Sequence, residues 1–403
     1  MRLPKTALLF RKVTLFVVAS GLSLLCAEIA VRVFGIGPEI APVYASNYRL
    51  ASNPVLRYEL VPGSVDGSEA INSHGMRDRE YARDKPPGTI RIACIGDSIC
   101  YGFNVRQSEA FSAHLEELLG SVGNDSGLTF EVLNFGVTGY SFTQIMENLR
   151  AKVANFEPDL IVYAYCLNDP QEYSLEMESL LAELTNAERH FVGRDTESGR
   201  PWIHRSRLFL LGKYAVESAT REGKSKHPAP RPFEDDQQLV AIRHGTYAEY
   251  YTRIHASPET WKPVEDGLHE LAKWSRDSRI PVQVTLFPVL RNLRDYPLYD
   301  LHADLERTFR DHLFSTLDLV DSYREYEAET GRRLGMTLHP DAEGHRLTAV
   351  AMIYDLAEAG LLPGLDVRRV GPRLDKLPKF RVVHDIVKRV RGDGTATTPM
   401  STP

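Results

Sequence analysis

A serine and the two residues before it carry the strongest catalytic signal in the chain. Gly96-Asp97-Ser98 ends a short apolar run, residues 90–96, of the kind that forms a buried strand. A serine at the carboxyl end of a parallel strand stands in the crevice where open α/β sheets bind ligands. Backbone N–H groups of the following turn can stabilise an oxyanion. The tripeptide alone is weak evidence, because Gly-Asp-Ser is also ordinary turn sequence.

Three later segments supply groups that complement this serine. Asn134 to Gly139 follows a second apolar run, and Asn168-Asp169 follows a third. His339-Pro340 comes far downstream, with Gly344-His345 behind it. Since the carboxyl ends of parallel strands meet at one edge of a sheet, these segments predict a nucleophile, two oxyanion donors and a base at one site.

Alternating strands and helices must position these groups. Residues 90–96, 130–135 and 160–167 predict strands, and the spacing of apolar residues predicts helices over 111–119 and 142–156. The alternation then continues with a helix at 263–277, strands at 282–287 and 317–320, and a closing helix at 346–359. This order predicts an α/β fold with a doubly wound, mostly parallel sheet flanked by helices.

A polar insertion, residues 171–262, interrupts the alternation. We expect a helix at 174–190 and a loose loop at 221–238 within it. The insertion is expected to shape the site, but its fold does not follow from the sequence.

The four blocks, taken in this order, resemble those of the SGNH (GDSL-type) hydrolases. The family's blocks resemble residues 95–102, 134–139 and 167–169 and the segment that begins at His339. The resemblance spans about residues 89–360 and implies the SGNH-hydrolase, flavodoxin-like fold. It implies Ser98 as the nucleophile and His339 as the general base. It also implies an oxyanion hole formed by the N–H groups of Ser98 and Gly139 and by the Asn168 side chain. Residues 72–77 resemble a segment of membrane-anchored members, and we expect a structural turn there.

The sequence departs from the family pattern at one position. The family usually has Asp three residues before the catalytic His, where it orients the imidazole and stabilises its charged form; this chain has Met336. Three explanations stay open: a Ser98–His339 dyad oriented by a backbone carbonyl, another acid in its place, or weakened hydrolytic activity. The acids nearby in the sequence are Asp321, Asp341 and Glu343.

The remaining histidines and cysteines give weaker signals. His345 is expected to be structural. Cys100 and Cys166 lie within two residues of expected site residues, so they could pair in an oxidising compartment, tune the pocket, or be small buried hydrophobes. The other histidines considered have no partners at metal-ligand spacing: His74, His302 and His312. With neither a phosphate loop nor a dinucleotide fingerprint in the sequence, we expect no nucleotide cofactor and no metal.

The first 35 residues predict a segment that targets the chain to a membrane. Four basic residues precede an uncharged run from Val13 to Ala27, and the apolar character continues to about Phe34. We interpret this as an uncleaved signal anchor that crosses the membrane once, with the amino terminus in the cytoplasm and the main domain outside. A cleaved signal peptide would need small residues where Leu25 and Cys26 stand. The other alternative, a buried amphipathic helix, would need a polar face that this run lacks.

The carboxyl-terminal tail is basic. Between residues 368 and 391 it holds nine Lys or Arg against two Asp. Its apolar residues fall on one helical face: Val382, Val383, Ile386, Val387 and Val390. Such a helix can lie on an anionic membrane surface, and a solvated terminus is the alternative.

Composition excludes several classes of protein. The chain is 43% hydrophobic and 25% charged, as globular proteins are, and its net charge of -6 gives no case for nucleic-acid binding. Four cysteines in 403 residues cannot form a disulfide scaffold. A mean hydropathy of -0.28 excludes a polytopic membrane protein. We therefore divide the chain into an anchor (1–35), a loop-rich juxtamembrane segment (36–88), a hydrolase domain (89–362) and a basic, partly disordered tail (363–403).

Together these features predict a membrane-tethered, extracytoplasmic serine esterase. Its expected substrate is an acylated cell-envelope glycan or a lipid ester, and transfer of the acyl group to a sugar hydroxyl would make it an O-acetyltransferase. Because of Met336, a catalytically weakened module that binds an envelope polysaccharide or a partner protein is the alternative. An interaction protein built on the insertion and the tail is a third possibility.

Overall fold

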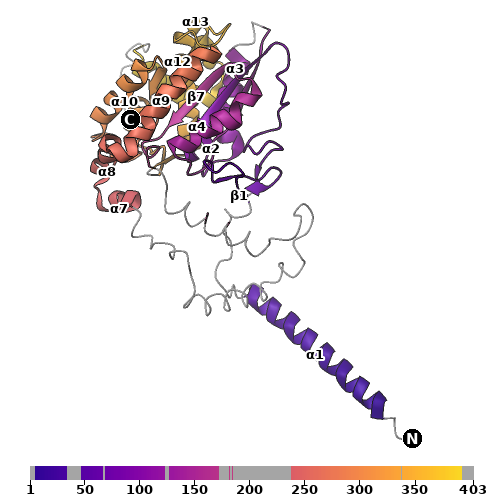
Figure 1. Cartoon of the computed structure of the whole chain (residues 1–403). Coiled ribbons are helices and arrows are strands. Elements are labelled where there is room, and N and C mark those ends of the chain that lie inside the picture. Colours follow the sequence, from indigo (N-terminus) through magenta and orange to yellow (C-terminus); the bar gives the residue numbers. More distant parts are fainter. Residues whose placement is uncertain are drawn as a thin grey trace, which may run out of the picture. The chain divides into compact units, whose positions relative to one another are not determined.

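The computed structural model describes residues 5–33, 47–66, 69–122, 127–171, 181, 184, 237–336 and 338–392. The chain divides into two compact units. The described part of the first is α1, a continuous helix over Lys5–Val33 (Figure 1). In the described part of the chain, no helix has both the length and the apolar character needed to cross a membrane. Membrane anchoring by the first 35 residues stays a prediction from the sequence.

A five-stranded parallel sheet forms the centre of the second unit, with the strand order β6-β5-β7-β8-β9. The strands are β5 (Thr89–Gly96), β6 (Thr129–Asn134), β7 (Leu160–Tyr165), β8 (Val282–Leu286) and β9 (Ser315–Asp318). The order reverses between β5 and β7, which is the position where doubly wound sheets bind ligands. The predicted α/β class and parallel sheet are confirmed. Both β7 and β8 are buried at every position, as their apolar sequences indicate.

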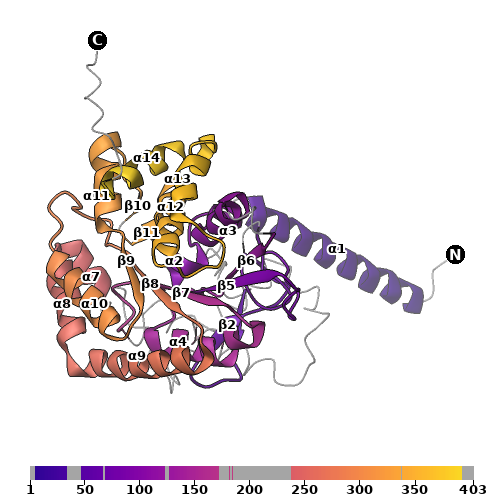
Figure 2. The same ribbon diagram turned by 90° about the horizontal axis from the view of Figure 1, so that it is seen from above.

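Helices cover both faces of this sheet (Figure 2). α3 (Phe111–Val122) and α12 (Ala342–Glu358) lie on one face, and α4 (Phe142–Ala151) and α9 (Pro258–Ser278) lie on the other. The apolar residues whose spacing predicts α3 are all buried: Phe111, Leu115, Leu118 and Leu119. The helix expected over 142–156 is shorter than expected, because α4 ends at Ala151 and a 3₁₀ turn follows over Val153–Phe156.

The described residues before β5 pack on the domain. Two short hairpins occupy it, β1 (Tyr48–Leu50) with β2 (Tyr58–Leu60) and β3 (Val65–Asp66) with β4 (Glu69–Ala70). The Tyr58 hydroxyl donates to the Thr138 carbonyl at 2.9 Å, and the Tyr140 hydroxyl donates to the Tyr58 carbonyl at 2.6 Å. The sequence did not predict these hairpins, because each is short and buries few residues within a loop-rich composition.

The same segment covers the outer edge of β6. The Asp78 carboxylate accepts the Asn134 N–H at 2.8 Å, and Glu116 on α3 accepts the Val132 N–H at 2.7 Å. The Tyr81 hydroxyl donates to the Val132 carbonyl at 2.9 Å. These bonds occupy backbone groups of Val132 and Asn134 that could otherwise pair with a further strand.

The described end of the insertion is helical. α7 (Gln237–His244) and α8 (Tyr247–Ala256) lead into α9. The helix expected at 174–190 and the loop expected at 221–238 lie almost wholly outside the described residues.

The basic tail is folded, which corrects the prediction of a membrane-surface helix or a loose terminus. It forms α13 (Val367–Leu374) and α14 (Arg381–Val390), and the apolar face of α14 packs on α11 (Val320–Thr330) and on α12. Val383, Ile386 and Val387 are buried there. Basic side chains of the tail pair with acids of the domain, as Lys379 does with Glu117 and Arg391 with Glu358. An apolar helical face therefore indicated burial here, with the domain as the partner. Residues 393–403 lie outside the described residues.

Candidate active site

Ser98 occupies a sharp turn between β5 and α2 (Ser98–Tyr101). The turn requires glycine at Gly96, where φ is +156° and a Cβ would lie 2.9 Å from the Ala164 carbonyl oxygen. The Asp97 carboxylate caps α2 by accepting the Ile99 N–H at 3.0 Å. This strand-turn-helix arrangement places the Ser98 side chain at the carboxyl edge of the sheet.

The loop after β6 is fixed against α2 by a glycine. A Cβ at Gly136 would lie 2.2 Å from the Tyr101 backbone nitrogen, so only glycine allows the two backbones to approach this closely. The Asn134 side chain accepts the Gly136 N–H at 2.9 Å and holds the loop in place. The loop continues to Gly139, which has φ of +73° and lines the same cavity as Ser98. No acceptor for the Gly139 N–H occurs among the described residues.

His339 reaches Ser98 from a late hairpin. β10 (Gly335–Met336) pairs antiparallel with β11 (His339–Pro340), with Met336 directly opposite His339. His339 Nε2 lies 2.9 Å from Ser98 Oγ. The imidazole also packs on the Phe103 ring, with centroids 4.8 Å apart. Burial lowers the pKa of His339 from 6.5, while the negative charge of Asp97 raises it. The neutral, proton-accepting imidazole is thus favoured.

None of the three acids suggested by the sequence contacts His339 in the structure. Asp321 is exposed on α11 and pairs with Arg324 at 2.9 Å. Asp341 caps α12 by accepting the Glu343 and Gly344 N–H groups at 3.0 and 2.9 Å. The Glu343 carboxylate pairs with Arg346. Within the described ranges, the only hydrogen bond of the His339 ring is the one to Ser98, and no carboxylate of those ranges orients it directly.

Asn168 lies in the loop after β7. Its side-chain N–H donates to Asp97 Oδ2 at 3.1 Å, which fixes the amide beside the nucleophile turn. The Ser98 hydroxyl is 3.4 Å from the same oxygen. The structure therefore brings the predicted nucleophile, base and oxyanion donors to one cavity: Ser98, His339, Gly139 and Asn168.

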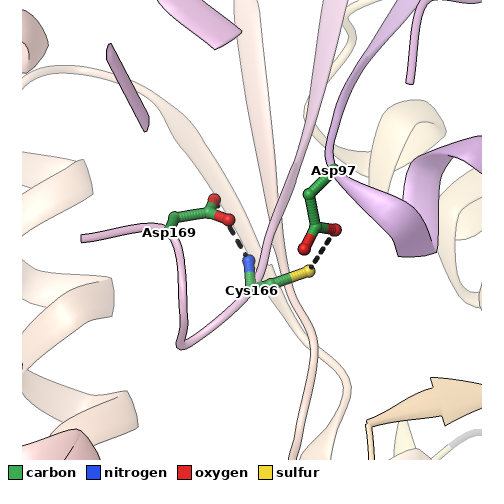
Figure 3. Close-up of side chains that lie close together, drawn as sticks. All are labelled: Asp97, Cys166 and Asp169. Carbon is green, nitrogen blue, oxygen red and sulfur yellow. Dashed lines mark hydrogen bonds between the residues drawn. The ribbon is translucent and has the colours of Figure 1, made fainter. Parts of the chain in front are cut away.

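Cys100 and Cys166 are both free and buried, so the two do not form a disulfide. Burial raises the pKa of both thiols well above 9 and keeps them protonated. The Cys166 thiol donates to Asp97 Oδ1 at 3.1 Å, and its backbone N–H donates to Asp169 Oδ2 at 3.3 Å (Figure 3). One potential ligand atom from each of these three residues lies within 4.8 Å of the others, a spacing that could hold a cation. A protonated thiol is a poor metal ligand, however, so the cluster as it stands favours hydrogen bonding.

The cavity itself measures about 160 Å³. Its apolar walls come from several elements and include Phe103, Leu167, Phe287, Val289 and Leu338. Two polar residues come from the insertion, Gln238 on α7 and Tyr251 on α8, and their side chains hydrogen-bond at 3.0 Å. Sequence reasoning missed these wall residues, because no motif marks a side chain that only lines a pocket.

The other residues singled out in the sequence are structural. His345 is buried, accepts the Phe111 N–H on Nδ1 at 3.1 Å, and has a pKa lowered to about 3 by burial. His302 pairs with Asp318 at 3.1 Å, away from the cavity. In the 72–77 segment, Arg77 donates to the carbonyls of Tyr101, Gly102 and Val105 at 3.3, 3.2 and 2.7 Å, and so supports the chain that follows α2.

The family of the chain follows from comparison with known proteins. The model of the GDSL-like lipase/acylhydrolase family matches residues 94–347, more than half of the chain. The chain therefore belongs to this family, as its four motif blocks indicated, and is an ester hydrolase. No curated protein matches the sequence.

Several crystal structures share the fold at low similarity. TesA is 13% identical with a TM-score of 0.36, and the match covers 68% of this chain and 99% of that one. LAE5, an α/β hydrolase from the metagenome of Lake Arreo in Spain, is 16% identical with a TM-score of 0.38, covering 68% and 96%. A catalytic mutant of Axe2, an acetylxylan esterase from Geobacillus stearothermophilus, is 13% identical with a TM-score of 0.38, covering 66% and 94%. Likenesses of this strength say nothing about the substrate.

Proposed function

We propose that the chain is a serine esterase in which Ser98 is the nucleophile and His339 is the general base. The observation that carries this proposal is the 2.9 Å hydrogen bond between Ser98 Oγ and His339 Nε2, at the edge of a cavity beside the carboxyl ends of the strands. That distance lies within the range that direct proton transfer needs.

The reaction runs in two halves. Ser98 Oγ attacks the ester carbonyl while its proton passes to His339 Nε2, and the carbonyl oxygen becomes an oxyanion. The Ser98 and Gly139 N–H groups and the Asn168 amide stabilise that oxyanion. Collapse of the intermediate expels the alcohol, which takes the proton from His339 and leaves an acyl group on Ser98. Water, deprotonated by the same imidazole, then releases the acid; a sugar hydroxyl in place of water would make the reaction a transfer.

The cavity favours a small acyl group. A closed apolar cavity of about 150 Å³ accommodates benzene, which has six heavy atoms; the volume of about 160 Å³ here is similar. Acetyl and propionyl groups fit such a space. We therefore propose a short-chain ester, such as an O-acetylated glycan of the cell envelope, as the substrate.

We also retain the proposal that α1 tethers the chain to a membrane, with the catalytic unit on the outer side. The sequence supports it, since basic residues precede the uncharged run from Val13 to Ala27. Apolar side chains on the described helix are exposed, among them Leu15, Phe16 and Leu22. Fractionation of cells that express the full chain, with and without residues 1–35, tests this. Loss of membrane association on deletion supports the tether, and equal distribution of both forms contradicts it.

Hydrolysis of p-nitrophenyl acetate by the full chain tests the esterase proposal. Ser98→Ala and His339→Ala should each lower kcat/KM by about 10³-fold or more. Matched controls are Ser278→Ala and His269→Ala, which change exposed residues on α9 and should leave turnover unchanged. Equal turnover of the Ser98→Ala variant and the unsubstituted chain would contradict the proposal.

One observation favours a second function. Because no carboxylate of the described residues hydrogen-bonds His339, the site could bind an acylated glycan without efficient turnover. Binding of an acetylated oligosaccharide that is equally tight in the unsubstituted chain and in Ser98→Ala, with negligible hydrolysis by both, would support this binding module.

A further inference from the structure

Two buried carboxylates lie directly behind the nucleophile, and their hydrogen bonds differ. Asp97 only accepts: from the Ile99 N–H at 3.0 Å, the Cys166 thiol at 3.1 Å and the Asn168 amide at 3.1 Å. The Ser98 hydroxyl oxygen also lies 3.4 Å from Asp97 Oδ2. A carboxyl group surrounded by donors on both oxygens is in its ionised form, because an ionised carboxylate is acceptor-only. Asp97 therefore carries a negative charge.

Asp169 is in the opposite state. It is fully buried, and burial together with the charge of Asp97 raises its pKa well above the ordinary value of 3.8. The Tyr163 hydroxyl donates to Asp169 Oδ2 at 2.5 Å, while Oδ1 has no partner among the described residues. The raised pKa favours the neutral, protonated form of this buried carboxyl group. Two carboxyl groups whose environments hold them in different protonation states typically have different roles.

The charge of Asp97 lies close to the base. Asp97 Oδ2 and His339 Nε2 are 3.4 and 2.9 Å from Ser98 Oγ, so the two atoms are at most about 6.3 Å apart. The negative charge of Asp97 raises the pKa of His339, against the lowering effect of burial.

The elements packed against β11 supply no other free acid to the imidazole. Asp341 of α12 is held by the helix N-cap, and Glu343 pairs with Arg346. His345 of α12 is neutral, with a pKa of about 3, and the Cys100 thiol of α2 is protonated.

We propose that Asp97 is a positioning residue that supplies the negative charge missing at position 336. It stabilises the imidazolium of His339 electrostatically and holds the Asn168 amide toward the oxyanion. When Ser98 attacks, the O–H bond breaks, the proton moves to His339 Nε2, and Asp97 stays ionised throughout. Asp169 stays neutral, so that it does not compete for the donors that hold Asp97. This inference rests on the proposed esterase function.

The test is the pH dependence of kcat/KM for p-nitrophenyl acetate in the full-length chain. Asp97→Asn removes the negative charge near His339. The acidic limb of the pH profile of kcat/KM should therefore move down by about one to two pH units. At pH 7, kcat/KM should fall about ten- to one-hundred-fold. Asp169→Asn is the matched control, because it replaces a neutral neighbour in the same cluster, and it should leave the limb in place.

A second variant controls for two side effects of Asp97→Asn: misfolding, and an amide N–H at position 97 that has no acceptor. Asp97→Ser keeps an N-cap side chain for α2 and should shift the limb in the same direction. Asn168→Ala should lower kcat without moving the limb, which separates loss of the oxyanion donor from loss of the charge.

The outcomes are distinguishable. A downward shift in both Asp97 variants, absent in Asp169→Asn, supports the inference. An unmoved limb in Asp97 variants that still turn over ester through Ser98 would overturn this inference alone. Absence of Ser98-dependent turnover in the unsubstituted chain would overturn the esterase proposal and this inference with it.

Discussion

Replacing Met336 by Asp should make the enzyme faster. The β10–β11 register places position 336 directly opposite His339. Residues paired in this way have Cβ atoms about 4.5–5.5 Å apart on the same face of the ladder. A carboxylate introduced at position 336 would therefore stand beside the imidazole.

The size of the gain follows from Coulomb's law. Two unit charges about 5 Å apart, at an effective dielectric constant of about 20, attract by ~3 kcal/mol. The half-buried site and the existing charge of Asp97 reduce this, so we expect kcat/KM at pH 7 to rise about ten- to one-hundred-fold. Loss of the corresponding Asp in a serine protease lowers kcat by about 10⁴, which sets an upper bound.

The assay compares Met336→Asp with Met336→Asn, a neutral side chain of the same shape. Both are measured for p-nitrophenyl acetate hydrolysis across pH 4 to 9. The aspartate variant should be faster, and its acidic limb should move to higher pH, because a nearby negative charge raises the pKa of the imidazole. Equal rates for the two variants, or an unmoved limb in Met336→Asp, would refute the electrostatic reasoning.

Four further outcomes are expected. Because burial lowers the pKa of His339, kcat/KM of the unsubstituted chain should stay constant as pH falls to about 6.5 and decline only below it; a limb above pH 7 would contradict this. Because of the cavity volume, kcat/KM should be highest for acetate and propionate esters and should fall for octanoate, as a series of p-nitrophenyl esters would show. Gly136→Ala should abolish activity in the ester assay by displacing α2. Gly120 lies in open space on α3, so Gly120→Ala should leave activity unchanged. Urea denaturation of Gly120→Ala should show a free energy of unfolding raised by up to about 1 kcal/mol. Arg77→Met should lower the free energy of unfolding by about 3 kcal/mol, because it strands three carbonyls, and an unchanged urea midpoint would contradict that role.

The sequence predicted the sheet and the paired groups at its edge because both depend on local patterns. Continuous apolar runs located β5, β6 and β7. The serine, glycine and asparagine then fell at strand ends, where parallel strands must gather them. His339 was found by its motif, and the structure places it 2.9 Å from Ser98.

The features that the sequence did not reveal depend on which partner a side chain or a helix face contacts in the folded chain. Asp341 directly precedes a helix, which is a signal for an N-cap, and its carboxylate does cap α12; that signal could have removed it from the candidate acids. In the sequence Asp97 is only part of an ordinary turn tripeptide, and its hydrogen bonds with Cys166 and Asn168 and its closeness to Ser98 become visible only in the structure. The apolar face of α14 was visible in the sequence, but periodicity cannot distinguish a membrane from the protein's own α11 and α12 as its partner.

The most direct test of the central claim is covalent labelling of the nucleophile. A fluorophosphonate reacts with a serine only when a base activates it, and intact-mass analysis counts the adducts. The account predicts one adduct on the unsubstituted chain, none on Ser98→Ala, and strongly slowed labelling of His339→Ala. An adduct that persists in Ser98→Ala, or an unlabelled chain that still hydrolyses ester, would contradict it.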